Sequence, residues 1–186
     1  MAFRSVRLAV VSDGLVPGVD AVMIDTAGLS GRPVADDDLA FVSRVWNDGR
    51  VAPTIGGLRT EQQLLDRIRH WTRHWNAHGF GPTVFHQRTT GRPIGWGGLQ
   101  HSTIGIGERL TVGYVIAPEV WGCGYATEVA AASVAHAFGV LGASDLYASV
   151  LSTNAPSRRV LEKAGLSIHR EIDHGDHVEV IYRITR

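Results

Sequence analysis

The stretch from Val115 to Glu128, with the sequence VIAPEVWGCGYATE, decides how this chain folds. It begins as an apolar strand, passes through a turn marked by Gly122 and Gly124, and continues into an alanine-rich helix from about Ala126. The two glycines allow backbone conformations that a side chain forbids, and they let a ligand approach the backbone closely. The first turn of a helix carries unpaired N–H groups and the positive end of the helix dipole. The stretch therefore predicts a binding site for phosphate groups.

Length and composition indicate one domain with a small-molecule or peptide partner. The chain has 186 residues, of which 44% are hydrophobic, which suffices for one full core and is short for two. Lys and Arg balance Asp and Glu at 18 each, so no net charge attracts the chain to nucleic acid or to a membrane surface. The single cysteine excludes an internal disulfide and suits a reducing cytoplasm, where we expect the protein. The apolar run Leu8–Val11 is too short for a secretory signal, and Val129–Ala143 is too short to span a bilayer.

Periodicity and turn residues predict an α+β domain over residues 26–186, preceded by an N-terminal extension or loose edge strand over residues 1–25. Helices are predicted over residues 36–46, 60–78, 126–138 and 155–164, and a capping box at Thr60 opens the second of them. Strands are predicted over residues 27–34, 83–87, 94–99, 111–116, 146–150, 167–172 and 178–184. This order implies a mixed, mostly antiparallel sheet flanked by helices. The strands on either side of the long helix are predicted to form one central parallel pair.

Two other nucleotide-binding motifs fit the glycine turn less well. A dinucleotide-binding turn would have its third glycine at Thr127, and an acidic residue would follow the next strand, where the chain reads Val150-Leu151-Ser152-Thr153. A P-loop needs Gly-Lys-Ser/Thr after the turn, and this sequence lacks it. A purely structural turn between strand and helix stays as the simplest alternative.

A second marked helix start follows at Asn154-Ala155-Pro156-Ser157, and its helix stops at Ala164-Gly165-Leu166. Together the two segments resemble the acetyl-CoA site of the GNAT N-acetyltransferase superfamily, and more closely its RimJ/RimL-like branch. Residues 121–128 match the Trp-Gly-x-Gly-Tyr-Ala-Thr-Glu pattern usual in that branch, although the wider superfamily has Arg or Gln in place of Trp121. The resemblance implies that backbone N–H groups of residues 122–126 hold the pyrophosphate of acetyl-CoA and that the preceding strand pairs with its pantetheine. The cofactor-binding residues that it implies are Tyr114, Val115, Ile116, Trp121, Gly122, Cys123, Gly124, Tyr125, Ala126, Thr127, Asn154 and Ser157.

The same resemblance defines the catalytic groups less fully. The general-acid tyrosine of many GNAT enzymes would stand at Leu161, which cannot donate a proton. Ser157 lies one turn earlier on the same helical face, and a serine at this place in the RimJ/RimL-like branch is thought to lie near the CoA sulfur. The glutamate that related enzymes use as a base would stand at Thr111. We therefore consider His101, Glu108 and bulk water as routes for the proton of the amine, with water slightly favoured.

Histidines at positions 70, 74 and 78 recur every four residues beside the apolar face of the second predicted helix. Such a position usually holds half-buried histidines, and no carboxylate or cysteine completes a ligand set, so we predict no metal site. A role in lining the acceptor pocket is also open to them. Cys123 lies in the pyrophosphate turn, and the distance from there to the thioester argues against a covalent acetyl-cysteine.

Two functions are compatible with the resemblance, which covers roughly residues 27–186 and is weakest at Gly28 and Gly31, where larger residues are expected. The first is an acetyl-CoA-dependent N-acetyltransferase that moves the acetyl group directly to a primary amine, on a protein N-terminus or a small molecule. The alternative is a non-catalytic acyl-CoA-binding sensor or assembly subunit, because Thr111 replaces the expected carboxylate. The expected partners are acetyl-CoA and an amine acceptor, without nucleic acid or membrane, and a homodimer stays open. The sequence does not identify the amine.

Overall fold

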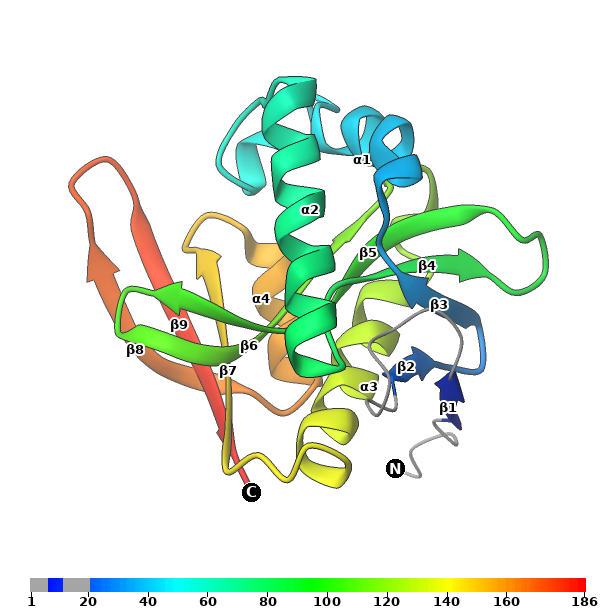
Figure 1. The fold of residues 1–186 in the computed structure, drawn as a ribbon. Helices are drawn as coiled ribbons and strands as arrows, with labels where there is room; N and C mark the ends of the chain where they lie inside the picture. Colours follow the sequence, from blue (N-terminus) through cyan, green and yellow to red (C-terminus); the bar gives the residue numbers. More distant parts are fainter. Residues whose placement is uncertain (1–6, 12–20) are drawn as a thin grey trace.

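A seven-stranded sheet with helices on both of its faces forms the centre of the structure (Figure 1). The computed structural model describes residues 7–11 and 21–186. The strand order of the sheet is β3-β4-β5-β6-β7-β9-β8. The strands are β1 (Arg7–Val11), β2 (Ala21–Asp25), β3 (Leu29–Pro33), β4 (Thr83–Gln87), β5 (Pro93–Ile104), β6 (Gly107–Ile116), β7 (Asp145–Leu151), β8 (Ser167–Asp173) and β9 (Val178–Thr185). The helices are α1 (Leu39–Trp46), α2 (Glu61–His78), α3 (Tyr125–Gly139) and α4 (Ala155–Lys163), and short 3-10 turns cover Asp36–Asp38, Ala52–Thr54 and Pro118–Val120.

Among the described strands of this sheet, β6 and β7 form the parallel pair that the sequence predicts. They pair at Thr111 opposite Tyr147, whereas the other neighbours in the sheet are antiparallel. A parallel pair needs a long crossover connection, and α3 supplies it. The register between the two strands ends at this point, although β6 continues to Ile116 and β7 to Leu151. The two strands therefore separate toward their C-terminal ends.

Local capping sets the helix boundaries. At the start of α2 the Gln63 N–H donates to the Thr60 hydroxyl at 3.2 Å, and the Thr60 N–H donates to the Gln63 side chain at 2.9 Å. This capping box confirms the predicted helix start. Gly79 ends α2 in the left-handed conformation, with a φ of 72°. None of the helices in the described ranges combines the length and the apolar character needed to cross a membrane.

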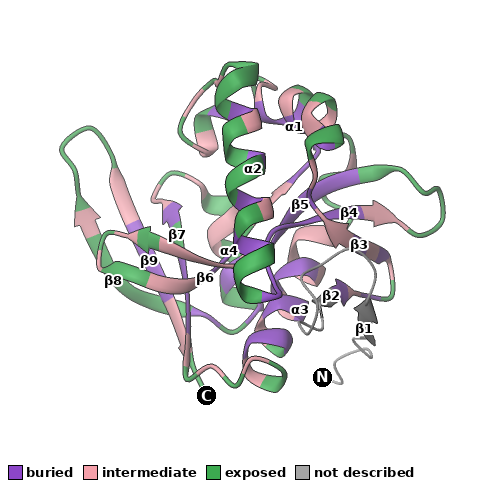
Figure 2. Cartoon of the chain, viewed as in Figure 1, coloured by how far each residue is buried: buried purple, intermediate pink, exposed green. Residues whose placement is uncertain are grey.

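The two faces of the sheet carry separate parts of the core. Figure 2 shows α2 exposed on its outer side and buried toward the sheet. The core between the sheet and the first two helices includes Val42, Trp46, Ile68, Trp71, Val84 and Trp96. The core between the sheet and the last two helices includes Leu99, Val112, Ala130, Leu146, Leu161 and Val180. The separation of β6 from β7 thus lies between two packed layers.

The N-terminal segment contains more regular structure than the predicted loose extension. β1 and β2 pair antiparallel, from Arg7 opposite Asp25 to Val11 opposite Ala21, in a sheet of their own. Residues 1–6 and 12–20 of the predicted extension lie outside the described residues.

Close packing explains the two glycines at the first strand of the large sheet. A Cβ at Gly31 would lie 2.5 Å from the Thr83 methyl group and 2.6 Å from the Ile24 carbonyl oxygen. At Gly28 the N–H donates to the Glu128 carboxylate at 2.8 Å, and a Cβ would lie 3.0 Å from that carboxylate. A larger residue would not fit at Gly31, and at Gly28 it would require the Glu128 carboxylate to move.

Candidate functional site

The separation of β6 from β7 exposes hydrogen-bonding groups of the β6 backbone. The Ala117 N–H donates to the Ile94 carbonyl at 2.8 Å, which fixes a hydrogen-bonded pair with β5. Along an antiparallel pair, such residues alternate with residues whose N–H and C=O groups point to the other side. The backbones of Ile116 and Tyr114 therefore point away from β5, into the opening between β6 and β7. Because the register with β7 ends at Thr111, these groups face a ligand-sized gap.

Trp121 uses one of these backbone groups. Its indole N–H donates to the Ile116 carbonyl at 2.7 Å, although the residue is 50% exposed. The indole thereby fixes the turn after β6 at the position where the wider superfamily has Arg or Gln. The backbone of Val115 faces β5, by the same alternation. The strand residues predicted to bind the cofactor are Tyr114, Val115 and Ile116. Because Val115 faces β5 and the Ile116 carbonyl is bonded to Trp121, Tyr114 is the residue whose N–H and C=O groups both point into the opening without use by Trp121.

The turn after β6 presents a row of N–H groups without acceptors. Gly122 and Gly124 have φ values of 80° and 88°, and nothing lies within 4 Å of a Cβ built at either position. Gly124 is the N-cap of α3 and has no side chain that could accept a hydrogen bond, and the Glu128 N–H is the first that donates back, to the Gly124 carbonyl. Within the described ranges, the N–H groups of Gly122 and of residues 124–127 donate to no acceptor. Such a group of N–H donors at a helix start fits the pyrophosphate of acetyl-CoA.

A cavity of about 1250 Å³ joins this turn to the opening in the sheet. The predicted cofactor-binding residues that line it are Tyr114, Val115, Ile116, Trp121, Gly122, Gly124, Tyr125, Ala126, Thr127, Asn154 and Ser157. Cys123 is exposed and does not line the cavity. The cavity also reaches α1, α2 and the turn between β8 and β9, and its volume exceeds the ordinary range of roughly 300–1,000 Å³ for one small ligand. This size suits a site for two substrates.

The start of α4 places Ser157 beside Tyr114. The Asn154 side chain caps the helix by accepting a hydrogen bond from the Ser157 N–H at 3.2 Å. The Ser157 hydroxyl lies 3.0 Å from the Tyr114 hydroxyl, which also donates to the Ser157 carbonyl at 3.1 Å. Burial raises the pKa of Tyr114 to about 12, against a smaller lowering by the hydrogen bond with Ser157. The two hydroxyl groups are thus both protonated at neutral pH and form a connected pair beside the cavity.

The hairpin of β5 and β6 is longer than predicted, which changes the position of the two candidate bases, His101 and Glu108. Instead of a strand that ends at residue 99 and another that begins at residue 111, the two strands continue as a long hairpin with its turn at residues 105–106. Glu108 is an exposed residue of β6 near this turn and does not line the cavity. Thr111, at the position of the family's carboxylate, is buried, and its hydroxyl donates to the Gln100 carbonyl at 3.1 Å.

The predicted histidine stripe forms a structural contact with β5. His74 is 8% exposed, its Nδ1 donates to the Phe80 carbonyl at 2.9 Å, and its Nε2 accepts from the His101 N–H at 2.9 Å. Burial lowers the pKa of His74, and both ring nitrogens are in use, so the ring stays neutral. The His101 ring lies 5.0 Å from the His78 ring, centre to centre, and does not line the cavity. In the described part of the chain, no group of three or more His, Cys, Asp or Glu side chains is arranged to hold a metal.

A histidine–carboxylate pair that the sequence analysis did not single out lines the cavity instead. His174, in the turn between β8 and β9, places its Nε2 3.2 Å from Glu179 Oε2. Glu179 also accepts a hydrogen bond from the Ser149 hydroxyl at 2.5 Å. Burial alone would raise the pKa of Glu179, but hydrogen bonds from Ser149, His174 and the Gly105 backbone outweigh it and lower the pKa. Pairing of Glu179 with Leu151 at the end of β7 brings this pair to the opening, which no local spacing could reveal.

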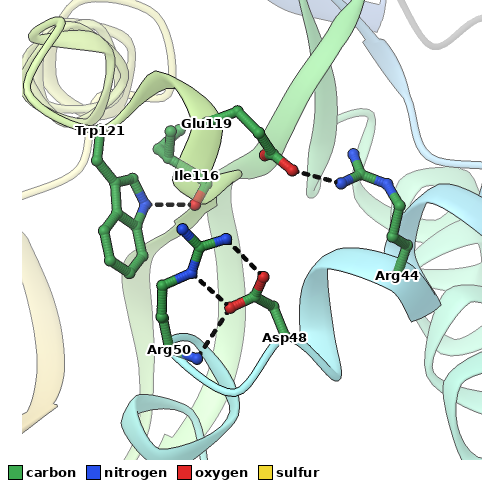
Figure 3. A network of polar contacts seen from close by, with 6 residues as sticks. All are labelled: Arg44, Asp48, Arg50, Ile116, Glu119 and Trp121. Atoms are coloured by element: carbon green, nitrogen blue, oxygen red, sulfur yellow. Dashed lines mark hydrogen bonds and ion pairs between the residues drawn. The ribbon is translucent and has the colours of Figure 1, made fainter.

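The segment between α1 and α2 approaches the turn after β6 (Figure 3). Arg50 pairs with Asp48 at 2.8 Å, and its guanidinium carbon lies 6.0 Å from the centre of the Trp121 ring. Arg44 of α1 pairs with Glu119, just before the turn, at 2.8 Å. Exposed ion pairs of this kind add little stability individually. They do, however, hold α1 and the segment that follows it next to the turn after β6.

Comparison with known families agrees with this site. Residues 29–167 match the Acetyltransferase (GNAT) domain family. The match covers most of the chain, so the protein belongs to the GNAT acetyltransferases, a family that uses acetyl-CoA. Over 145 residues the chain is 27% identical to the uncharacterized N-acetyltransferase YoaA of Bacillus subtilis strain 168, which corresponds to 77% of this chain and 81% of YoaA.

Solved structures share the fold at lower identity. An acetyltransferase from Agrobacterium tumefaciens strain C58 is 23% identical, with a TM-score of 0.78 over 94% of this chain and 99% of that chain. A ribosomal-protein-S5-alanine acetyltransferase from Vibrio fischeri is 16% identical, with a TM-score of 0.70 over 88% of this chain and 96% of that chain. Both neighbours share the fold of this chain over most of its length.

Proposed function

We propose that the protein is an acetyl-CoA-dependent N-acetyltransferase that transfers the acetyl group directly to a primary amine. The observation that carries the proposal is the group of N–H donors at Gly122 and residues 124–127, which have no acceptor in the described part of the chain, beside the opening between β6 and β7. In this site the turn would hold the pyrophosphate, and the backbone of Tyr114 would pair with the pantetheine. Direct transfer is supported by the position of Cys123, the single cysteine of the chain, outside the cavity lining.

Ser157 and Tyr114 supply the proton that the departing thiolate needs. As the bond between the amine nitrogen and the acetyl carbon forms, the carbon–sulfur bond breaks and leaves a thiolate. The Ser157 hydroxyl gives its proton to the sulfur and regains one from the Tyr114 hydroxyl, 3.0 Å away. The raised pKa of Tyr114 keeps that hydroxyl protonated until it is needed, and solvent restores it afterwards.

The proton of the attacking amine goes to His174. With Nε2–H donated to Glu179, the Nδ1 atom of His174 is free to accept a proton. The ionised carboxylate of Glu179 fixes the ring and stabilises the imidazolium that forms. Bulk water, His101 and Glu108, the routes considered from the sequence, compete with this assignment.

Binding and turnover are measured separately to test the proposal. Calorimetric titration with acetyl-CoA gives the affinity, and release of free thiol is followed over a panel of protein N-termini and small amines. The Cys123→Ala variant is the background for the thiol assay, because the exposed thiol would otherwise react with the reagent. Amine-dependent thiol release by this variant supports direct transfer. Binding of acetyl-CoA without release in any amine would instead identify a GNAT-fold acyl-CoA sensor.

A further inference from the structure

Arg67 of α2 lines the cavity within a group of tryptophans. Its guanidinium carbon lies 5.4 Å from the ring centre of Trp46 and 6.0 Å from that of Trp71. Both tryptophans line the cavity too, as does Trp96 of β5, whose ring is stacked on that of Trp46 at a centre distance of 6.2 Å. Contact with aromatic faces restricts the orientation of a guanidinium group. The N–H groups of Arg67 are therefore held at the cavity wall.

The charge of Arg67 has no counterion in the described part of the chain. Two arginines in the described ranges line the cavity, Arg50 and Arg67, and Arg50 has Asp48 as its carboxylate partner. Arg67 forms neither an ion pair nor a hydrogen bond with any residue in the ranges 7–11 and 21–186. Arg67 is an exposed residue, although partial burial of its guanidinium, and then the charge of Arg59, lower its pKa. An anion bound in the cavity could therefore pair with Arg67 without displacing a carboxylate of the protein.

The position of Arg67 favours an anion on the acceptor over the phosphates of CoA. The arginine that approaches the turn at Gly122–Thr127 is Arg50, through its contact with Trp121, whereas Arg67 contacts Trp46 and Trp71. These tryptophans are only 5–6% exposed, but the edges that line the cavity are apolar, which suits contact with a hydrocarbon or aromatic group of the acceptor. His174 and Glu179 line the same cavity, where they serve the amine.

We propose that the acceptor is an amine that also carries a carboxylate and an apolar group, as an apolar amino acid does. Arg67 binds the carboxylate through two parallel N–H···O hydrogen bonds, and the tryptophans contact the apolar group. This inference rests on the proposed function, because it assigns the second substrate of the same site.

The test compares leucine with leucinamide, two acceptors that differ in the carboxylate. Arg67→Gln is expected to lower kcat/KM for leucine by about 10- to 100-fold relative to leucinamide, with the KM for acetyl-CoA unchanged. Arg69→Gln is the matched control, since it removes the same charge from the same helix at a residue that does not line the cavity and pairs with Asp36. Equal losses for both acceptors, or a rise in the KM for acetyl-CoA, would overturn the proposal, and the second result would assign Arg67 to the phosphates.

A binding measurement separates this inference from the proposed function. N-acetylleucine carries the carboxylate and the apolar group without a reactive amine, and its binding is followed by tryptophan fluorescence in the presence of CoA. Binding to the parent with at least 10-fold weaker binding to Arg67→Gln supports the carboxylate site whether or not any amine is acetylated. Equal binding by the two proteins, together with acetyl transfer to amines that lack a carboxylate, would retain the transferase and exclude the carboxylate site.

Discussion

The two halves of the cavity are built from different chemical groups. The proposed cofactor half consists mainly of backbone: the N–H groups of Gly122 and residues 124–127 and the backbone groups of Tyr114 on β6. The proposed acceptor half consists of side chains, namely Arg67, His174 and Glu179, from elements far apart in the sequence. Backbone groups are the same for every residue, so the first half depends on conformation and the second on residue identity. Acceptor preference can therefore change by substitution while the cofactor half stays as it is.

The largest effect is expected from a change of conformation in the cofactor half. Gly124→Val places a β-branched side chain at a φ of 88°, in the space that the pyrophosphate needs, so acetyl-CoA should bind about 10³-fold more weakly. Calorimetry measures the affinity, and circular dichroism checks that the fold persists. Gly142→Val is the control, because Gly142 also has a positive φ, 63°, with open space around it, but lies after the other end of α3. An affinity within about twofold of the parent would show that the turn does not hold the phosphates.

Loss of the thiolate acid should lower turnover without touching the cofactor half. Ser157→Ala is expected to reduce kcat by about 10²-fold and to leave the affinity for acetyl-CoA nearly unchanged. The helix start should persist, because the Asn154 side chain bonds to the backbone N–H of residue 157 and not to its hydroxyl. Tyr114→Phe is the companion variant and should cause a smaller loss, since Ser157 still reaches the sulfur. An unchanged kcat in Ser157→Ala would leave the serine with a structural role alone.

A pH profile tests the proposed acceptor half. If a group of the enzyme accepts the proton, the acid inflection of the rate does not move with the pKa of the acceptor. His174→Gln should remove the inflection and lower the rate at neutral pH by about 10- to 100-fold, and Glu179→Gln should shift it. His101→Gln is the control, because its ring packs against His78 outside the cavity lining. Loss of the inflection in His101→Gln instead, or an inflection that follows the acceptor, would refute the assignment to His174.

The smallest effect concerns the stability of α3, which the cofactor half needs. His136 is 2% exposed, its ring nitrogens have no partner in the described part of the chain, and burial lowers its pKa to about 4. The unfolded state, with a histidine pKa of about 6.5, therefore takes up the proton more readily. Stability is complete above about pH 6.5 and falls as the pH drops toward 4, by about 2.5 kcal/mol at pH 4.5. In His136→Leu, the free energy of unfolding measured with denaturant should no longer fall between pH 6.5 and 4.5 through this residue. An identical pH dependence in the parent and the variant would contradict the role of His136.

The structural elements around the proposed cofactor half could be predicted from the sequence. Positive φ at Gly122 and Gly124 and the Asn154 cap follow from a few neighbouring residues, and the parallel pair follows from the strand–helix–strand order. The members of the proposed acceptor half meet through strand pairing, which no local pattern shows. His101 and Glu108 fall just outside the strands predicted over residues 94–99 and 111–116, but the structure places both within strands, since β5 continues to Ile104 and β6 begins at Gly107.

The neighbours of individual side chains could not be predicted from the sequence either. Nothing in the spacing of Arg67 shows that Trp46 and Trp71 flank it or that it lacks a carboxylate partner. Conversely, the regular spacing of the histidines on α2 invited a shared role, whereas the fold gives His74 two backbone partners of its own. Periodicity identifies the face of a helix, but the neighbours on that face come from the rest of the fold.

The separation of β6 from β7 also interrupts the hydrogen-bond ladder of the sheet. The strands before α3 and those after it are joined in the sheet by the pairing of Thr111 with Tyr147, and beyond it the ladder is interrupted. A pantetheine lying in the interruption would act as a short extra strand and restore continuity between the two parts. The substrate would then be a temporary strand of the sheet, and the departure of CoA would require the hydrogen bonds of that strand to break.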